Sequence, residues 1–187
     1  MALQIGLQIL LPAFLLIGLW RGAFKSRLEW LLNALAVSAV CLFVFLTARW
    51  DFTSYYIRVL LPLLIAAAAY SSYRRANGSH GGRRKLKLSV AALTNAALLV
   101  VFSGLSLFAL SGYGAPEEAI QLSYPLRDGT YYVGGGNSRF VNNHQAHDPQ
   151  KFALDIVRLN LLGSRAWGLA PDEPERYEMG FVRKICG

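Results

Sequence analysis

The chain has 187 residues, of which 54% are hydrophobic, and its formal net charge at neutral pH is +8. Apolar residues are concentrated in residues 1–113, which argues against a single water-soluble core. Residues 1–113 hold eleven Lys and Arg but only two acidic residues, Asp51 and Glu29, whereas residues 114–187 hold eight Lys and Arg and nine Asp and Glu. The positive charge therefore belongs to the apolar half and does not indicate a basic soluble domain.

Four segments of the first half are long and apolar enough to cross a membrane. They cover residues 2–20, 28–48, 52–73 and 88–113. A spanning helix needs roughly 20 mainly apolar residues to cross ~30 Å of hydrocarbon. No Lys or Arg precedes the first segment, so it is not typical of a signal peptide. We therefore expect a transmembrane anchor of four helices over residues 1–113.

Basic residues in the loops between these segments predict the orientation. Residues 21–27 hold three Lys and Arg and residues 74–87 hold six, whereas the loop at 49–51 is only Arg-Trp-Asp. Short loops rich in Lys and Arg stay in the cytoplasm, so both termini should face the outside. Residues 74–87 can also be interpreted as a nucleic-acid patch, but contact with anionic lipid explains them more simply. His80 in this loop has no acidic or cysteine neighbour, and we interpret it as solvated.

Polar residues inside the predicted spans favour helix packing over transport. Asn33 and Asn95 are the amides placed deep in a span, and such groups commonly bond a neighbouring helix. The predicted spans lack the buried charged residues that mark a transport pathway. Cys41 lies within a span and Cys186 lies in the other half, so we expect no disulfide between them.

The second half is strand-like after a linker. Residues 114–123 change from apolar to mixed composition and form this linker. The extended candidates are TYYV (130–133), which leads into three glycines, SRFVNNH (138–144) and KFALDIVRLN (151–160). Both faces of the last candidate are mostly apolar, which predicts a strand covered on both sides.

Asp155 interrupts that apolar strand and needs a partner. A buried carboxylate requires a cation, a metal or several hydrogen-bond donors. Chemistry alone favours a structural aspartate bonded to backbone amides over a metal ligand. His144 shifts the balance slightly toward a metal, because imidazole and carboxylate are normal zinc ligands and the two residues fall on adjacent predicted strands. His147 is better interpreted as a solvated loop residue.

Residues 124–177 carry an ordered series of motifs. These are P-L…G-x-Y-Y-V followed by glycines, V-N-x-H, and Q-x-F-A-x-D, then Gly163 and Gly168 and an acidic, proline-containing segment before Tyr177. The series resembles the start of the lysostaphin-type zinc metallopeptidase domain. The resemblance implies a mainly antiparallel β domain that cleaves peptide cross-links of bacterial peptidoglycan with one zinc ion. It also implies zinc ligands from an H-x-x-x-D motif and from a late H-x-H motif, whose other histidine helps to activate water.

Carried over by position, the resemblance makes Asp155 the family's aspartate ligand. The histidine of H-x-x-x-D falls on Lys151, and the upstream His144 is the substitute that the resemblance suggests. No histidine follows His147, so the late H-x-H has no counterpart. We therefore expect a truncated domain over residues 124–187 with His144 and Asp155 as metal residues, no catalytic residue, and zinc bound weakly or not at all.

These expectations combine into a multi-pass protein of the bacterial cytoplasmic membrane with both termini outside. Its outer part is expected to be an incomplete, inactive relative of peptidoglycan hydrolases. The alternative is a non-enzymatic membrane protein whose outer tail binds an envelope or cell-wall partner.

Overall fold

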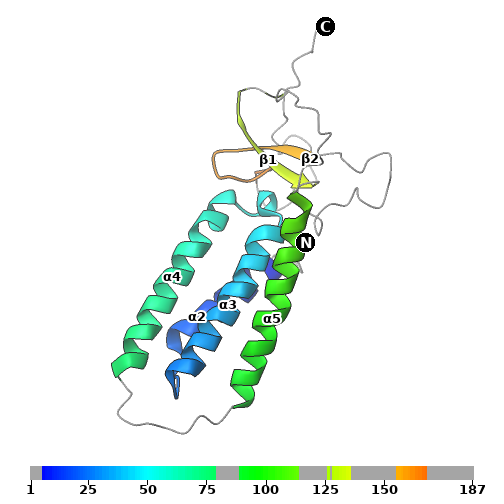
Figure 1. Ribbon diagram of the computed structural model, residues 1–187. Coiled ribbons are helices and arrows are strands. Elements are labelled where there is room, and N and C mark those ends of the chain that lie inside the picture. Colours follow the sequence, from blue (N-terminus) through cyan, green and yellow to red (C-terminus); the bar gives the residue numbers. More distant parts are fainter. Residues whose placement is uncertain (1–5, 79–88, 114–125, 127, 136–154, 168–187) are drawn as a thin grey trace. The chain divides into compact units, whose positions relative to one another are not determined.

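The structure is a computed structural model that describes residues 6–78, 89–113, 126, 128–135 and 155–167 (Figure 1). Its helical elements are η1 (Gly6–Leu10), α2 (Leu11–Arg21), α3 (Arg27–Thr47), η2 (Trp50–Phe52), α4 (Tyr55–Gly78), α5 (Val90–Leu110) and η3 (Ser111–Tyr113), and its strands are β1 (Thr130–Gly135) and β2 (Asp155–Leu159). The chain divides into two compact units. Unit 1 comprises Met1–Ala48 and Arg58–Leu107, and unit 2 comprises Arg49–Ile57 and Phe108–Gly187.

Among the described residues, three helices are long and apolar enough to cross a membrane. They are α3, α4 and α5, and the candidate membrane span in each is 21 or 22 residues long. These helices match the predicted segments 28–48, 52–73 and 88–113. The fourth predicted span, residues 2–20, is not confirmed. Its described part, from Gly6 to Arg21, is shorter than the other helices and at ~1.5 Å per residue covers ~24 Å, less than the ~30 Å of a bilayer core. Residues 1–5 lie outside the described part of the chain.

The start of α3 is fixed by a local capping arrangement. Ser26 has extended backbone angles, and its Oγ accepts a hydrogen bond from the Glu29 backbone N at 3.1 Å. The Glu29 carboxylate in turn accepts from the Lys25 backbone N at 2.9 Å. The first bond satisfies a backbone donor that the first turn of a helix leaves without a partner, and the second ties the residue before the N-cap to the helix. The sequence S-x-x-E therefore sets where the apolar helix begins.

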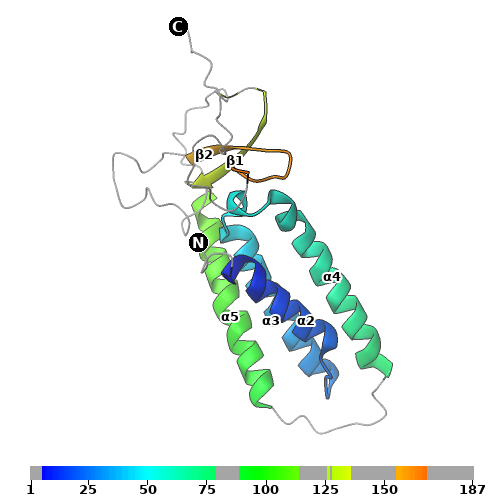
Figure 2. The same ribbon diagram turned by 180° about the vertical axis from the view of Figure 1, so that it is seen from behind.

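Helix α3 is the centre of unit 1, and its packing depends on small residues. Its buried positions are Ala34, Ala36, Val37, Ala39, Val40, Cys41 and Val44. Small side chains let helix backbones approach closely in membranes. Helix α3 packs along α2, and Figure 2 shows α3 between α4 and α5.

Polar and aromatic contacts join α3 to both other long helices. Trp30 Nε1 donates to Ser72 Oγ of α4 at 2.9 Å, and the Trp30 ring lies 5.0 Å from that of Tyr73. Asn33 Nδ2 donates to Asn95 Oδ1 of α5 at 3.4 Å. The predicted helix-packing role of these two amides is thereby confirmed. The outer faces of α4 and α5 expose many large apolar residues, among them Val100 at 73% and Leu107 at 68% exposure, as expected of helices surrounded by lipid.

Unit 2 contains a two-stranded antiparallel sheet. Thr130 of β1 pairs with Leu159 of β2, and Val133 pairs with Ile156. The register shifts by one residue between Val133 and Gly135, which is a β-bulge, so Gly135 faces Asp155. The predicted strands at 130–133 and 151–160 thus appear as β1 and, over its described residues, β2. The candidate at 138–144 lies outside the described residues.

Candidate functional site

The residues predicted to hold zinc are only partly within the described chain. Asp155 is the first residue of β2, is half-buried and lies opposite Gly135. His144, together with His80, His147, Lys151 and Cys186, falls outside the described residues. Within the described part, no group of three or more His, Cys, Asp and Glu is arranged to hold a metal ion. The predicted pairing of His144 with Asp155 therefore stays a prediction.

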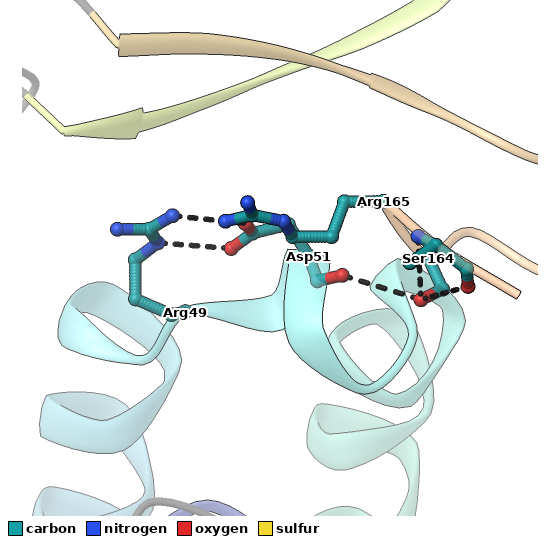
Figure 3. Close-up of polar contacts among 5 residues, drawn as sticks. Arg49, Asp51, Ser164 and Arg165 are labelled. Atoms are coloured by element: carbon teal, nitrogen blue, oxygen red, sulfur yellow. Dashed lines mark hydrogen bonds and ion pairs between the residues drawn. The ribbon is translucent and has the colours of Figure 1, made fainter. Parts of the chain in front are cut away.

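The most developed polar cluster of unit 2 surrounds a different aspartate, Asp51 of η2. Asp51 has 0% exposure. Its carboxylate accepts two parallel hydrogen bonds from Arg49, with both N···O distances at 2.9 Å. Arg165 Nη1 lies 3.6 Å from Asp51 Oδ2 on the other side. Figure 3 shows the two guanidinium groups converging on this carboxylate. A paired, bidentate arrangement is what a buried carboxylate needs to offset the loss of water.

The backbone of Asp51 is bound by the same distant segment of chain. Asp51 O accepts a hydrogen bond from the Arg165 backbone N at 2.8 Å and one from Ser164 Oγ at 3.3 Å. Ser164 and Asp51 are 113 positions apart in sequence. Both the charge and the main chain of Asp51 therefore join the loop between α3 and α4 to the turn after β2.

Two further bonds extend this junction toward the first turn of α4. Ser54 Oγ donates to Leu162 O at 2.7 Å, and the Tyr55 backbone N donates to Gly163 O at 2.8 Å. Gly163 has a φ of +72°, and an added Cβ would lie 3.1 Å from Tyr55 N. A left-handed backbone and a close approach of two main chains both require glycine here. We call residues 49–55 together with 160–166 the loop junction.

Asn160 holds the second half of the loop junction in shape. Its side chain is nearly buried, at 9% residue exposure. Asn160 Oδ1 accepts from the backbone N of Leu162 at 2.9 Å and of Ser164 at 3.1 Å, and Nδ2 donates to Ala166 O at 3.1 Å. These bonds satisfy backbone groups of a turn that would otherwise be left without partners. The turn is thus preformed to present Ser164 and Arg165 to Asp51.

Arg49 connects the loop junction to the sheet. A Cβ placed on Gly134 of β1 would lie 2.9 Å from Arg49 Nη2 and 3.1 Å from its Cζ, so the guanidinium packs on the bare backbone of that glycine. The next residue, Gly135, faces Asp155. The hydrogen bonds to Asp51 raise the pKa of Arg49, burial opposes this, and the charges of Asp51 and Asp155 raise it further. Arg49 is therefore a permanent cation near Asp155.

Aromatic rings line the same region. The guanidinium carbon of Arg49 lies 5.0 Å from the centre of the Phe52 ring, and that of Arg165 lies 4.8 Å from it. Tyr55 and Tyr132 have ring centres 6.3 Å apart in an edge-to-face arrangement. Cations near a ring face are attracted by its quadrupole. Phe52 thus helps to hold two like-charged groups close together around one carboxylate.

This arrangement is suited to holding residues 49–55 and 160–166 together and not to acid–base chemistry. Asp51 is enclosed by protein and both its oxygens face cations, so it cannot reach a substrate. Sequence reasoning missed Arg49, Asp51 and Arg165, because the loop was treated as a simple connection. One signal was present: Asp51 is one of only two acidic residues among residues 1–113, and it follows an arginine by two positions.

No family model, no curated protein and no solved structure matches this chain. In the part that the structure describes, the chain is mostly helical, with three helices able to span a membrane and a small antiparallel sheet. These features are compatible with a multi-pass membrane protein.

Proposed function

We propose that the chain is a membrane-anchored relative of the lysostaphin-type zinc metallopeptidases, with its sheet on the cell-wall side of a bacterial cytoplasmic membrane. One observation supports this above all. The segments TYYVGG and DIVRL, which contribute to the sequence resemblance, pair as antiparallel strands. The family domain is mainly antiparallel β, and the family's aspartate corresponds to Asp155 at the start of β2. The helices, including a fourth at residues 2–20, serve as the anchor in this proposal.

The residues of this chain fit a zinc ion poorly. The charges of Asp155 and Arg49 interact, and a cation beside this carboxylate disfavours a divalent metal ion. Position 151 carries lysine where the family has its first histidine. A catalytic zinc usually has three protein ligands, and this sequence matches the pattern only at Asp155, with His144 as a substitute for the first histidine. We therefore derive no hydrolytic step for this chain and assign it weak zinc affinity.

The charge around Asp155 also favours a second candidate function. Arg49 adds positive charge that interacts with Asp155, and the sequence has lysine at position 151, where hydrolytic relatives have a metal-binding histidine. An outer domain of this kind can bind an envelope partner, such as an acidic peptide of the cell wall, without cleaving it. In that case no metal would be needed.

Zinc titration and peptidoglycan sedimentation of the full chain in detergent test both candidates. We expect no tight one-to-one zinc binding by isothermal calorimetry, while purified peptidoglycan retains the protein on sedimentation. Tight zinc binding that is abolished both by His144→Ala and by Asp155→Asn would show that the chain has a metal site at these residues. Asp128→Asn, at an exposed position of the same domain, is the matched control. Failure of the protein to sediment with peptidoglycan would remove the support for a cell-wall role.

A further inference from the structure

Unit 1 contains an apolar groove between α2 and α4. Its volume is about 470 Å³, which is within the range of small-molecule sites at roughly 300–1,000 Å³. Its lining is almost entirely apolar and comes from Ala13, Leu16, Ile17 and Trp20 of α2 and from Leu64, Ala67, Ala68 and Ser71 of α4. Small residues of α4 create the space, because they leave the groove floor without large side chains. The groove is open along one side, as a site filled from the surrounding lipid would be.

One end of the groove is bordered by arginines from both helices. On α2, Arg21 follows Ile17 by four positions, so it lies on the groove face one turn beyond the lining residues. Its guanidinium carbon is 6.0 Å from the centre of the Trp20 ring. On α4, Arg74 follows Ser71 by three positions and lies 6.0 Å from the Tyr70 ring centre. Both arginines are exposed, at the end of unit 1 where α2 and α4 terminate (Figure 2).

This combination is amphipathic in a defined direction. The apolar groove is followed by two cations, Arg21 and Arg74, near the ends of α2 and α4. Planar guanidinium groups bind phosphate oxygens through paired hydrogen bonds, and aromatic residues such as Trp20 prefer the boundary between hydrocarbon and headgroups. Positive charge next to a membrane attracts anionic lipid. The one occupant that matches both parts is an anionic phospholipid, with an acyl chain in the groove and its phosphate at the arginines.

We propose that the α2–α4 groove is a binding site for an anionic glycerophospholipid, held by Arg21 and Arg74. The site does not depend on the peptidase resemblance. It gives α2, whose described helix is shorter than a full span, a fixed lipid partner alongside α4. The bound lipid would fill space that the protein's own side chains leave open. It would pack against α2 and α4 as a structural lipid of the anchor.

Native mass spectrometry of the full chain in detergent, titrated with phosphatidylglycerol or phosphatidylcholine, tests the proposal. We expect tighter one-to-one binding of phosphatidylglycerol, and we expect the double variant Arg21→Gln with Arg74→Gln to weaken it by about tenfold. Ala67→Leu should weaken binding of both lipids by filling the groove. Val100→Leu on the exposed face of α5 is the matched control for added bulk, and Arg27→Gln is the control for lost charge.

Three outcomes would overturn the proposal. Equal affinity for the two lipids would remove the role of the arginines. Unchanged lipid binding in Ala67→Leu would place the lipid elsewhere. Dimers that disappear in Ala67→Leu while lipid binding stays constant would show that a second copy of the chain fills the groove. Circular dichroism of each variant checks that the helices are retained.

Discussion

Replacing Asp51 with asparagine should open the loop junction selectively. The carboxylate receives two 2.9 Å hydrogen bonds from Arg49 and a 3.6 Å contact from Arg165. Removing one partner of a buried ion pair costs about 3–5 kcal/mol when the remaining charge stays buried. Here the arginine side chains are 25% and 29% exposed, so water can partly replace the lost partner. Asparagine also keeps one oxygen acceptor.

We therefore expect a loss of about 2–3 kcal/mol in the free energy of local opening, which corresponds to about 30- to 150-fold faster amide exchange. The assay is hydrogen exchange with mass spectrometry on the full chain in detergent micelles, with attention to peptides covering 49–57 and 160–167. The protected amides include Arg165 N and Tyr55 N, which cross the junction. Amides in the middle of α3 should exchange as in the unmodified protein.

Asp128→Asn is the matched control, because it makes the same chemical change at an exposed aspartate. Asp128 has a φ of +58°, a region that asparagine also tolerates. The control should shift exchange by less than about threefold, in line with surface substitutions within ±0.5 kcal/mol. Equal protection of residues 160–167 in Asp51→Asn and unmodified protein would refute the reasoning that Asp51 holds the junction together.

Two further substitutions test the parts of unit 2 in the same exchange assay. Asp155→Asn should speed exchange of β1 and β2 amides by about fivefold, the effect of losing roughly 1 kcal/mol from a half-buried charged contact; unchanged or slower exchange would instead mark Asp155 as a stranded metal ligand. Gly163→Ala should speed exchange at Tyr55 N by at least about tenfold, because alanine disfavours the left-handed backbone by roughly 1–2 kcal/mol and its Cβ would press on that amide. Gly104→Ala, where an added Cβ meets nothing within 4 Å, is the control that should show no such change.

Local sequence patterns predicted the positions of the helices and strands better than they predicted the contacts between distant residues. The apolar runs predicted α3, α4 and α5 because hydrocarbon thickness sets helix length directly. The alternating segments predicted β1 and β2 because the strand repeat is local. The helix boundaries differ from the predicted ones. Helix α4 begins at Tyr55 and not at residue 52, since residues 50–52 form η2.

The loop junction could not be predicted in the same way. Asp51 and Ser164 are 113 positions apart, and no local pattern reports such a pairing. The turn at 160–166 was treated only as a loop with glycines, although Asn160 and Gly163 are residue types that turns require. Asp155 was expected to need a cation, a metal or several hydrogen-bond donors, and its electrostatic interaction with Arg49 joins residues more than a hundred positions apart, which no local pattern indicates. The role of His144 stays a prediction.

The central claim is that the helices anchor a domain on the outer side of the membrane, and labelling of single cysteines tests it most directly. The starting protein carries Cys41→Ala and Cys186→Ser, and a cysteine is then placed at Ser79 or at Asn137 in intact cells. A membrane-impermeant maleimide should label the cysteine at position 137 and should label the one at position 79 only after the membrane is opened, because the basic loop stays in the cytoplasm. Labelling of both positions in intact cells, or of neither, would contradict the account.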